Sequence, residues 1–191
     1  MTYLADKLGG APAIRRLIAD TSLGGSGIEN LARNPEFGST LIGSTMSEIF
    51  ANFSAAVVLD SPQGAFGFSN LDMNGRHGDD CVPGHFCKVQ PTGSTEQWND
   101  DWQWPGETIE GWGLATYRFS QGTGDPLNLM VQPDRFGFEG AILVREAMTG
   151  TWTMSELRVD SSTGIGTGLI HDFGNATAEV WLLVWYNSLN D

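Results

Sequence analysis

The chain has few basic residues, and this scarcity limits the partners that it can bind. Of its 191 residues, 10 are Lys or Arg and 23 are Asp or Glu, which gives a formal charge of −13 at pH 7. A negative field of this size repels the phosphates of nucleic acids and the headgroups of anionic membranes. We therefore expect neither a nucleic-acid-binding protein nor one that attaches to an anionic membrane.

Long apolar runs are also missing, and we expect no leader segment. The longest apolar stretches, near residues 55–59 and 180–186, are far shorter than the roughly 20 residues that cross a bilayer. The first residues do not combine a positively charged stretch with an apolar segment. The sequence thus predicts no membrane span and no secretory signal.

Motifs of hydrolases are absent as well. There is no G-x-S-x-G, and the superficially similar Gly25-Ser26-Gly27 is better explained as a helix start, with at most a modest anion site. His171 precedes Asp172 in a predicted strand, where neighbouring side chains point to opposite faces and cannot form a dyad. We expect His171 to be structural.

Residues 45–59, TMSEIFANFSAAVVL, carry the clearest pattern in the chain. Thr45 and Glu48 have the spacing of a capping box, apolar residues follow at helical spacing, and Asp60 begins a stop signal. The pattern predicts a buried helix around which the N-terminal part is organised.

Three shorter helices are predicted before it. Residues 1–8 read as the end of a helix that stops at Gly9-Gly10, and Pro12 suits the first turn of the next one. The third begins with a second capping-box spacing, Ser26 with Glu29. The inner stripe of the second helix is expected to be Ile14, Leu17 and Ile18.

The C-terminal part favours strands. Seven Trp and 25 Gly with low charge are typical of an extracellular β-rich chain, and short alternating runs recur. Residues 178–186, AEVWLLVWY, are apolar at both odd and even positions. We therefore expect them to form a central strand of a sheet that is covered on both faces. The predicted strands, residues 114–120, 127–131, 141–144, 151–159, 166–173 and 178–186, form an antiparallel β-sandwich. The predicted fold class is therefore α+β: a helical subdomain (1–61), an irregular loop (62–106) and a sandwich (107–191).

The loop contains oxygen ligands that suit calcium. Asp72, Asn74, Asp79 and Asp80 surround two glycines, although their spacing departs from an EF-hand loop. The alternative, which we favour, is a solvated turn whose Asp and Asn side chains bond their own backbone. No other cofactor is predicted for the chain.

The same loop contains a set of residues that bind zinc in other proteins: His77, Cys81, His85 and Cys87. Their interleaved order lacks paired-ligand spacing, and a disulfide between Cys81 and Cys87 explains both sulfurs. We favour the disulfide, which would staple the loop in an oxidising compartment.

Three tryptophans, Trp98, Trp102 and Trp104, alternate with acidic residues in QWNDDWQW. They could form a platform for sugar rings, with Asp100 and Asp101 as acceptors. They could equally fix the loop onto the sandwich, because indoles supply large contact areas.

The segments YLADKLGG, AIRRLIAD, GGSGIENL, MSEIFANFSAAVVLD and FGFSNLD form an ordered series. The series resembles the region after the active site in secreted zinc metallopeptidases of the thermolysin-like superfamily, nearest the immune-inhibitor-A and hyicolysin-like branches. GWGLATYRF, FGFEGAILV and HDFGNATAEVWLLVWYN resemble the β-sandwich appended to these enzymes. The resemblance covers most of the chain outside residues 79–105, and it rests on the order and spacing of the motifs.

That family binds its zinc through H-E-x-x-H on one helix and a Glu on the next, and this chain has neither. The resemblance implies a fold and an extracellular location but no catalytic residue, with zinc confined to a missing catalytic part. The first interpretation is a non-catalytic C-terminal part that completes the peptidase cleft or holds substrate or a surface. The alternative is a free-standing extracellular binding or self-assembling module.

Either interpretation leaves a face to be covered. In the family the first helix lies beside the zinc-bearing helices. We therefore expect Leu4, Leu8 and part of the Ile14, Leu17 and Ile18 stripe to be uncovered in this chain. Residues 1–20 would then bind the complementary peptidase half or a second copy, and a protein or glycan substrate is the further partner expected.

Overall fold

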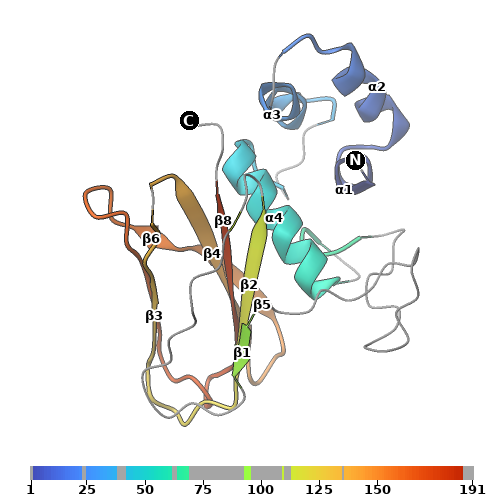
Figure 1. The fold of residues 1–191 in the computed structure, drawn as a ribbon. Helices are drawn as coiled ribbons and strands as arrows, with labels where there is room; N and C mark the ends of the chain where they lie inside the picture. Colours follow the sequence, from blue (N-terminus) through green and yellow to red (C-terminus); the bar gives the residue numbers. More distant parts are fainter. Residues whose placement is uncertain are drawn as a thin grey trace, which may run out of the picture. The chain divides into compact units, whose positions relative to one another are not determined.

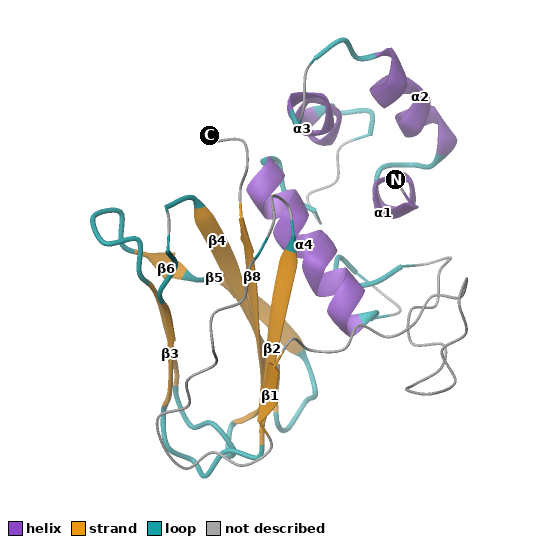
Figure 2. Cartoon of the chain, in the orientation of Figure 1, coloured by secondary structure: helices purple, strands orange, loops and turns teal. Residues whose placement is uncertain are grey.

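The computed structural model describes residues 2–22, 25–37, 42–61, 64–68, 93–95, 109, 113–134 and 136–186. The chain divides into two compact units, Met1–Val89 and Gln90–Asp191. The first contains the helices and the second contains the strands (Figures 1 and 2). The predicted α+β class is confirmed. Within the described ranges, no helix has the length and apolar character needed to cross a membrane.

The helical unit has its helices in the predicted segments. They are α1 (Thr2–Lys7), α2 (Ala11–Ala19), α3 (Ser26–Arg33) and α4 (Met46–Leu59). Pro12 lies in the first turn of α2, where its missing N–H has no helical partner to lose.

Both ends of α4 follow the sequence signals. Thr45 Oγ1 accepts a hydrogen bond from the backbone N–H of Glu48 at 3.2 Å, and Glu48 Oε2 accepts one from the N–H of Thr45 at 3.1 Å. At the other end Asp60 adopts a left-handed conformation, and its N–H donates to the carbonyl of Ala56 at 2.9 Å. The predicted capping box and stop are confirmed.

The second predicted capping box is wrong. The residue before α3 is Gly25, and no side chain caps this helix. The carboxylate of Glu29 instead accepts a hydrogen bond from the backbone N–H of Met46, at the start of α4. The capping-box spacing predicted that the Glu29 carboxylate would accept a hydrogen bond at the start of α3. It accepts one from a residue 17 positions further along the chain instead.

The helical unit has its own core, and α1 contributes to it. Leu4 and Leu8 are 8% and 1% exposed, so the expectation that they are left uncovered is wrong. Ile14 and Leu17 pack partly against this core, whereas Ile18 is 74% exposed. The buried members are Tyr3, Leu4, Leu8, Ala13, Leu31, Ala32, Ile42, Ile49, Ala56 and Phe68.

The second unit consists of two sheets. The larger has the strand order β1-β2-β8-β4-β5 and the smaller the order β3-β7-β6. β1 runs parallel to β2, and the other pairs of described strands are antiparallel. The strands are β1 (Gly93–Thr95), β2 (Leu114–Ser120), β3 (Leu127–Val131), β4 (Phe138–Glu146), β5 (Trp152–Glu156), β6 (Arg158–Val159), β7 (Gly166–Ile170) and β8 (Thr177–Tyr186).

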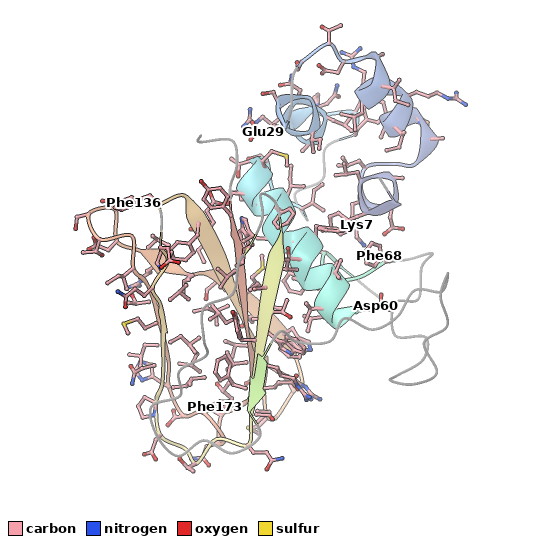
Figure 3. The ribbon with its side chains drawn as sticks, viewed as in Figure 1. Lys7, Glu29, Asp60, Phe68, Phe136 and Phe173 are labelled. Atoms are coloured by element: carbon pink, nitrogen blue, oxygen red, sulfur yellow. The ribbon has the colours of Figure 1, made fainter. Side chains whose placement is uncertain are left out.

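Both sheets contribute to one core, as in the predicted sandwich. Phe173 is fully buried in it and lies at the opposite end of the unit from the exposed Phe136 (Figure 3). β8 is the middle strand of the larger sheet, and its residues 180–185 are all buried, so the predicted central strand covered on both faces is confirmed. The core residues are Phe119, Leu127, Leu129, Phe138, Ile142, Leu157, Ile170, Phe173, Val180, Leu182 and Val184.

Two predicted strands are shorter than expected. Residues 151–159 break at Leu157, whose side chain enters the core and whose N–H donates to the carbonyl of Gly140 at 2.9 Å. β5 therefore belongs to the larger sheet and β6 to the smaller one. Residues 166–173 end as a strand at Ile170, because the chain turns at Asp172, which has a φ of 51°.

Candidate functional site

The ligand, disulfide and platform residues that the sequence singles out lie outside the described residues. This applies to the calcium candidates Asp72, Asn74, Asp79 and Asp80, to His77, Cys81, His85 and Cys87, and to Trp98, Trp102 and Trp104. In the part of the chain that the structure describes, no group of three or more His, Cys, Asp and Glu side chains could hold a metal ion.

His171 and Asp172 are described, and both are exposed. They lie in the turn after β7, and not on a strand as predicted. The Asp172 carbonyl accepts hydrogen bonds from the N–H groups of Asn175 at 3.0 Å and Thr177 at 3.2 Å. The backbone of Asp172 therefore shapes the turn that leads into β8.

The first polar cluster of the described residues lies on α1. Lys7 Nζ donates to the carbonyl of Gly64 at 2.8 Å and lies 3.0 Å from the carboxylate of Asp6. The side chains of Lys7 and Asp6 are 10% and 5% exposed, so the pair is largely removed from water. The ammonium group thus ties α1 to the turn that follows α4 (Figure 3).

Tyr3 joins the same cluster from the preceding turn of α1. Its hydroxyl donates to the carbonyl of Ala65 at 3.0 Å, and its ring meets Phe53 and Phe68 edge-on, with centroids 5.6 and 5.7 Å away. Burial raises the pKa of Tyr3, and the nearby charge of Asp6 raises it further. Tyr3 therefore remains a neutral hydrogen-bond donor at physiological pH.

The second polar cluster lies on the larger sheet. Glu179 on β8 accepts two hydrogen bonds on Oε1, from Arg118 Nε and from Trp181 Nε1, both at 2.8 Å. The guanidinium of Arg118 also lies 5.9 Å from the centroid of the Trp181 ring, within the range of a cation–π contact. Arg145 on β4 completes the cluster, with Nη1 at 3.8 Å from Glu179 Oε2.

The two clusters differ in what they can do chemically. The lysine pair has little exposed side-chain surface, and the ammonium group of Lys7 is bound by Asp6 and the carbonyl of Gly64, which suits a structural role. The arginines keep 41% and 46% of their side-chain surface exposed, so their N–H donors are accessible to solvent or a ligand.

Sequence reasoning missed both clusters because their members are far apart in the chain. Arg118 and Glu179 are 61 residues apart, and Lys7 and Gly64 are 57 apart. The signal that could have found the arginine cluster was an arginine in one predicted strand and a glutamate in another, both at polar positions of otherwise apolar strands. Choosing the pair requires the register of β2 on β8.

No protein-family model, curated protein or solved structure matches this chain.

Proposed function

We propose that this chain is the non-catalytic C-terminal part of a secreted zinc metallopeptidase, which completes the peptidase cleft or holds substrate or a surface. The observation that carries the proposal is the contact of Tyr3 with Phe53, Phe68 and Ala65. Tyr3, Phe53 and Phe68 come from three separate segments of the resemblance, YLADKLGG, MSEIFANF and the FGF turn, and Ala65 directly precedes the last one. Their meeting in one core supports reading the series as a unit with a shared fold.

In this role the helical unit supplies a scaffold. The capped helix α4 and the clamp between Lys7 and Gly64 hold the turn of residues 64–68 against α1. In the proposed peptidase, zinc, its ligands and the general base belong to the missing catalytic part, and the complementary half meets residues 1–20. Ile18 on α2 is 74% exposed and is available for that contact, whereas Leu4 and Leu8 are buried.

The loop is proposed to be stapled by a disulfide between Cys81 and Cys87, as expected for a protein secreted into an oxidising medium. Closing so short a loop removes little chain entropy, on the order of 2 kcal/mol, so its role would be to shape the loop locally. Mass spectrometry after oxidative folding should detect the linked pair, and two free thiols would refute the staple.

The proposed function has a direct test in the natural coding sequence before the Met1 codon. An in-frame H-E-x-x-H upstream supports the peptidase assignment. A stop codon and a promoter there would instead support a free-standing extracellular binding or self-assembling module.

A second test uses the purified chain. It should not hydrolyse casein, with or without added Zn²⁺, because the sequence lacks the family's H-E-x-x-H ligands. Chelator-sensitive proteolysis by clean material would contradict the proposal.

A further inference from the structure

The arginine cluster of the larger sheet has unused hydrogen-bond donors. Arg118 on β2 and Arg145 on β4 both flank β8, and in the register Arg118 pairs with Trp181 while Arg145 pairs with Glu179. Their guanidinium groups converge on one carboxylate, at 2.8 and 3.8 Å from Glu179. An anion placed beside that carboxylate can therefore reach both.

The donors are free because Glu179 satisfies few of them. Arg118 uses its Nε, and the 3.8 Å separation between Arg145 and Glu179 is too long for a hydrogen bond. Neither guanidinium has a further hydrogen-bond partner among the described side chains, and each can donate five hydrogen bonds. Water or a ligand must satisfy the remainder.

The guanidinium of Arg118 is also held in place, because it lies over the ring of Trp181. A group held in this way loses less freedom on binding a ligand. Arg145 lies near the β4–β5 turn, where a Cβ added to Gly150 would be 3.8 Å from its Nη2. Gly150 has a φ of 70°, a conformation that favours glycine and leaves the turn without a side chain over the arginine.

The local charge of the cluster favours an anion. Two arginines and one glutamate leave the cluster a net charge of +1, in a chain whose formal charge is −13. The two guanidinium groups attract a monoanion such as a sulfate ester. They attract a phosphate ester, which is close to a dianion at pH 7, more strongly, because the Coulomb energy scales with the charge of the ligand. Guanidinium groups match tetrahedral oxyanions with paired N–H donors.

We propose that Arg118 and Arg145 form a binding site for a tetrahedral oxyanion ester, a sulfate or phosphate group carried on a larger ligand. The assignment rests on the sheet unit alone and does not depend on the proposed peptidase origin. Glu179 is the positioning residue that aligns the two arginines.

Titration calorimetry of the full chain at low ionic strength tests the site, with glucose 6-sulfate and glucose 6-phosphate as probes and glucose as the neutral control. We expect a Kd of about 1 mM for at least one ester and no binding of glucose. Stronger binding of the sulfate ester would identify a sulfated ligand, and stronger binding of the phosphate ester a phosphorylated one. Absence of binding by both esters would overturn the proposal.

Variants distinguish this site from general attraction to a surface arginine. Arg145→Gln should weaken ester binding about tenfold without loss of fold, because Arg145 makes no close hydrogen bond. The matched control is Arg158→Gln, an exposed arginine on β6 of the other sheet, which should bind as the wild type does. Equal affinity in Arg145→Gln and the wild type, or an equal loss in Arg158→Gln, would overturn the site.

Discussion

Glu29 Oε1 accepts a hydrogen bond at 2.8 Å from the backbone N–H of Met46, so a side chain on α3 caps the first turn of α4. The first N–H groups of a helix have no partner within the helix, and a carboxylate there also interacts favourably with the helix dipole. This contact adds a tertiary cap to the local one made by Thr45.

Replacing Glu29 by alanine should therefore lower the free energy of unfolding by about 1 kcal/mol, the usual effect of losing a cap. Urea denaturation followed by circular dichroism measures the change. Glu36→Ala is the control, since Glu36 is an exposed glutamate beyond the end of α3. Equal effects of the two substitutions would show that the cap contributes nothing.

The part of the fold that the sequence predicted is the part determined by local signals. Residues 114–120 and 127–131 became β2 and β3 with the predicted bounds, because apolar residues occupy every second position in most of each run. The capping box of α4 was predicted because its two members are three residues apart.

Long-range contacts determine what the sequence did not predict. Leu157 interrupts a β-favouring run because its side chain packs into the core while the chain passes from one sheet to the other. Leu4 and Leu8 are buried because the helical unit has a core of its own, whereas the prediction assumed that the missing half covers them. The Arg118–Glu179 pair depends on strand register, which periodicity alone does not fix.

The burial of Leu8 and the exposure of Ile18 predict that aspartate at the two positions will have different effects on stability. Leu8→Asp should destabilise the helical unit by at least about 4 kcal/mol, because it places an unpaired charge in the core. Ile18→Asp should change stability by less than about 0.5 kcal/mol. Denaturant titrations of both variants test this, and a tolerated Leu8→Asp would show that the side chain of Leu8 is not part of the core.

The clamp between α1 and the turn of residues 64–68 can be tested through Lys7. Lys7→Met removes the ammonium group that pairs with the buried carboxylate of Asp6 and bonds to the carbonyl of Gly64. Removing one partner of a buried ion pair is destabilising, and we expect the free energy of unfolding to fall by about 3 kcal/mol.

Arg15→Met on the exposed side of α2 is the matched control for this substitution, because it removes a basic group that is open to solvent. Thermal unfolding of the two variants compares them directly. A loss no larger in Lys7→Met than in Arg15→Met would argue against the clamp.

Ser54 offers a stabilising substitution. It is fully buried on α4, and its hydroxyl has no hydrogen-bond partner among the described residues. Since a buried polar group without a partner costs free energy, Ser54→Ala should raise the free energy of unfolding by about 1 kcal/mol. The reverse change at the next position, Ala55→Ser, should lower it, because Ala55 is also fully buried. Destabilisation by Ser54→Ala would reveal a partner for the hydroxyl.

The last prediction concerns the turn between β6 and β7, where Asp160 Oδ1 accepts three hydrogen bonds. They come from Ser162 Oγ at 2.6 Å and from the backbone N–H groups of Ser162 and Thr163 at 2.8 and 2.9 Å. These bonds, with that from the Ser162 hydroxyl as the largest cause, lower the pKa of Asp160 to about 2.

Because this pKa is lower in the folded chain than in the unfolded chain, the ionised turn favours folding. Its contribution is fully present above the unfolded pKa of 3.8 and is lost as the pH falls through about 2. In a ¹³C NMR titration of the side-chain carboxyls, the Asp160 signal should therefore have its midpoint below 3.8, the ordinary value. Ser162→Ala removes the hydroxyl donor but keeps the backbone donors, so it should move the midpoint part of the way up. A wild-type midpoint at 3.8, unchanged by Ser162→Ala, would show that the turn does not bind the carboxylate in solution.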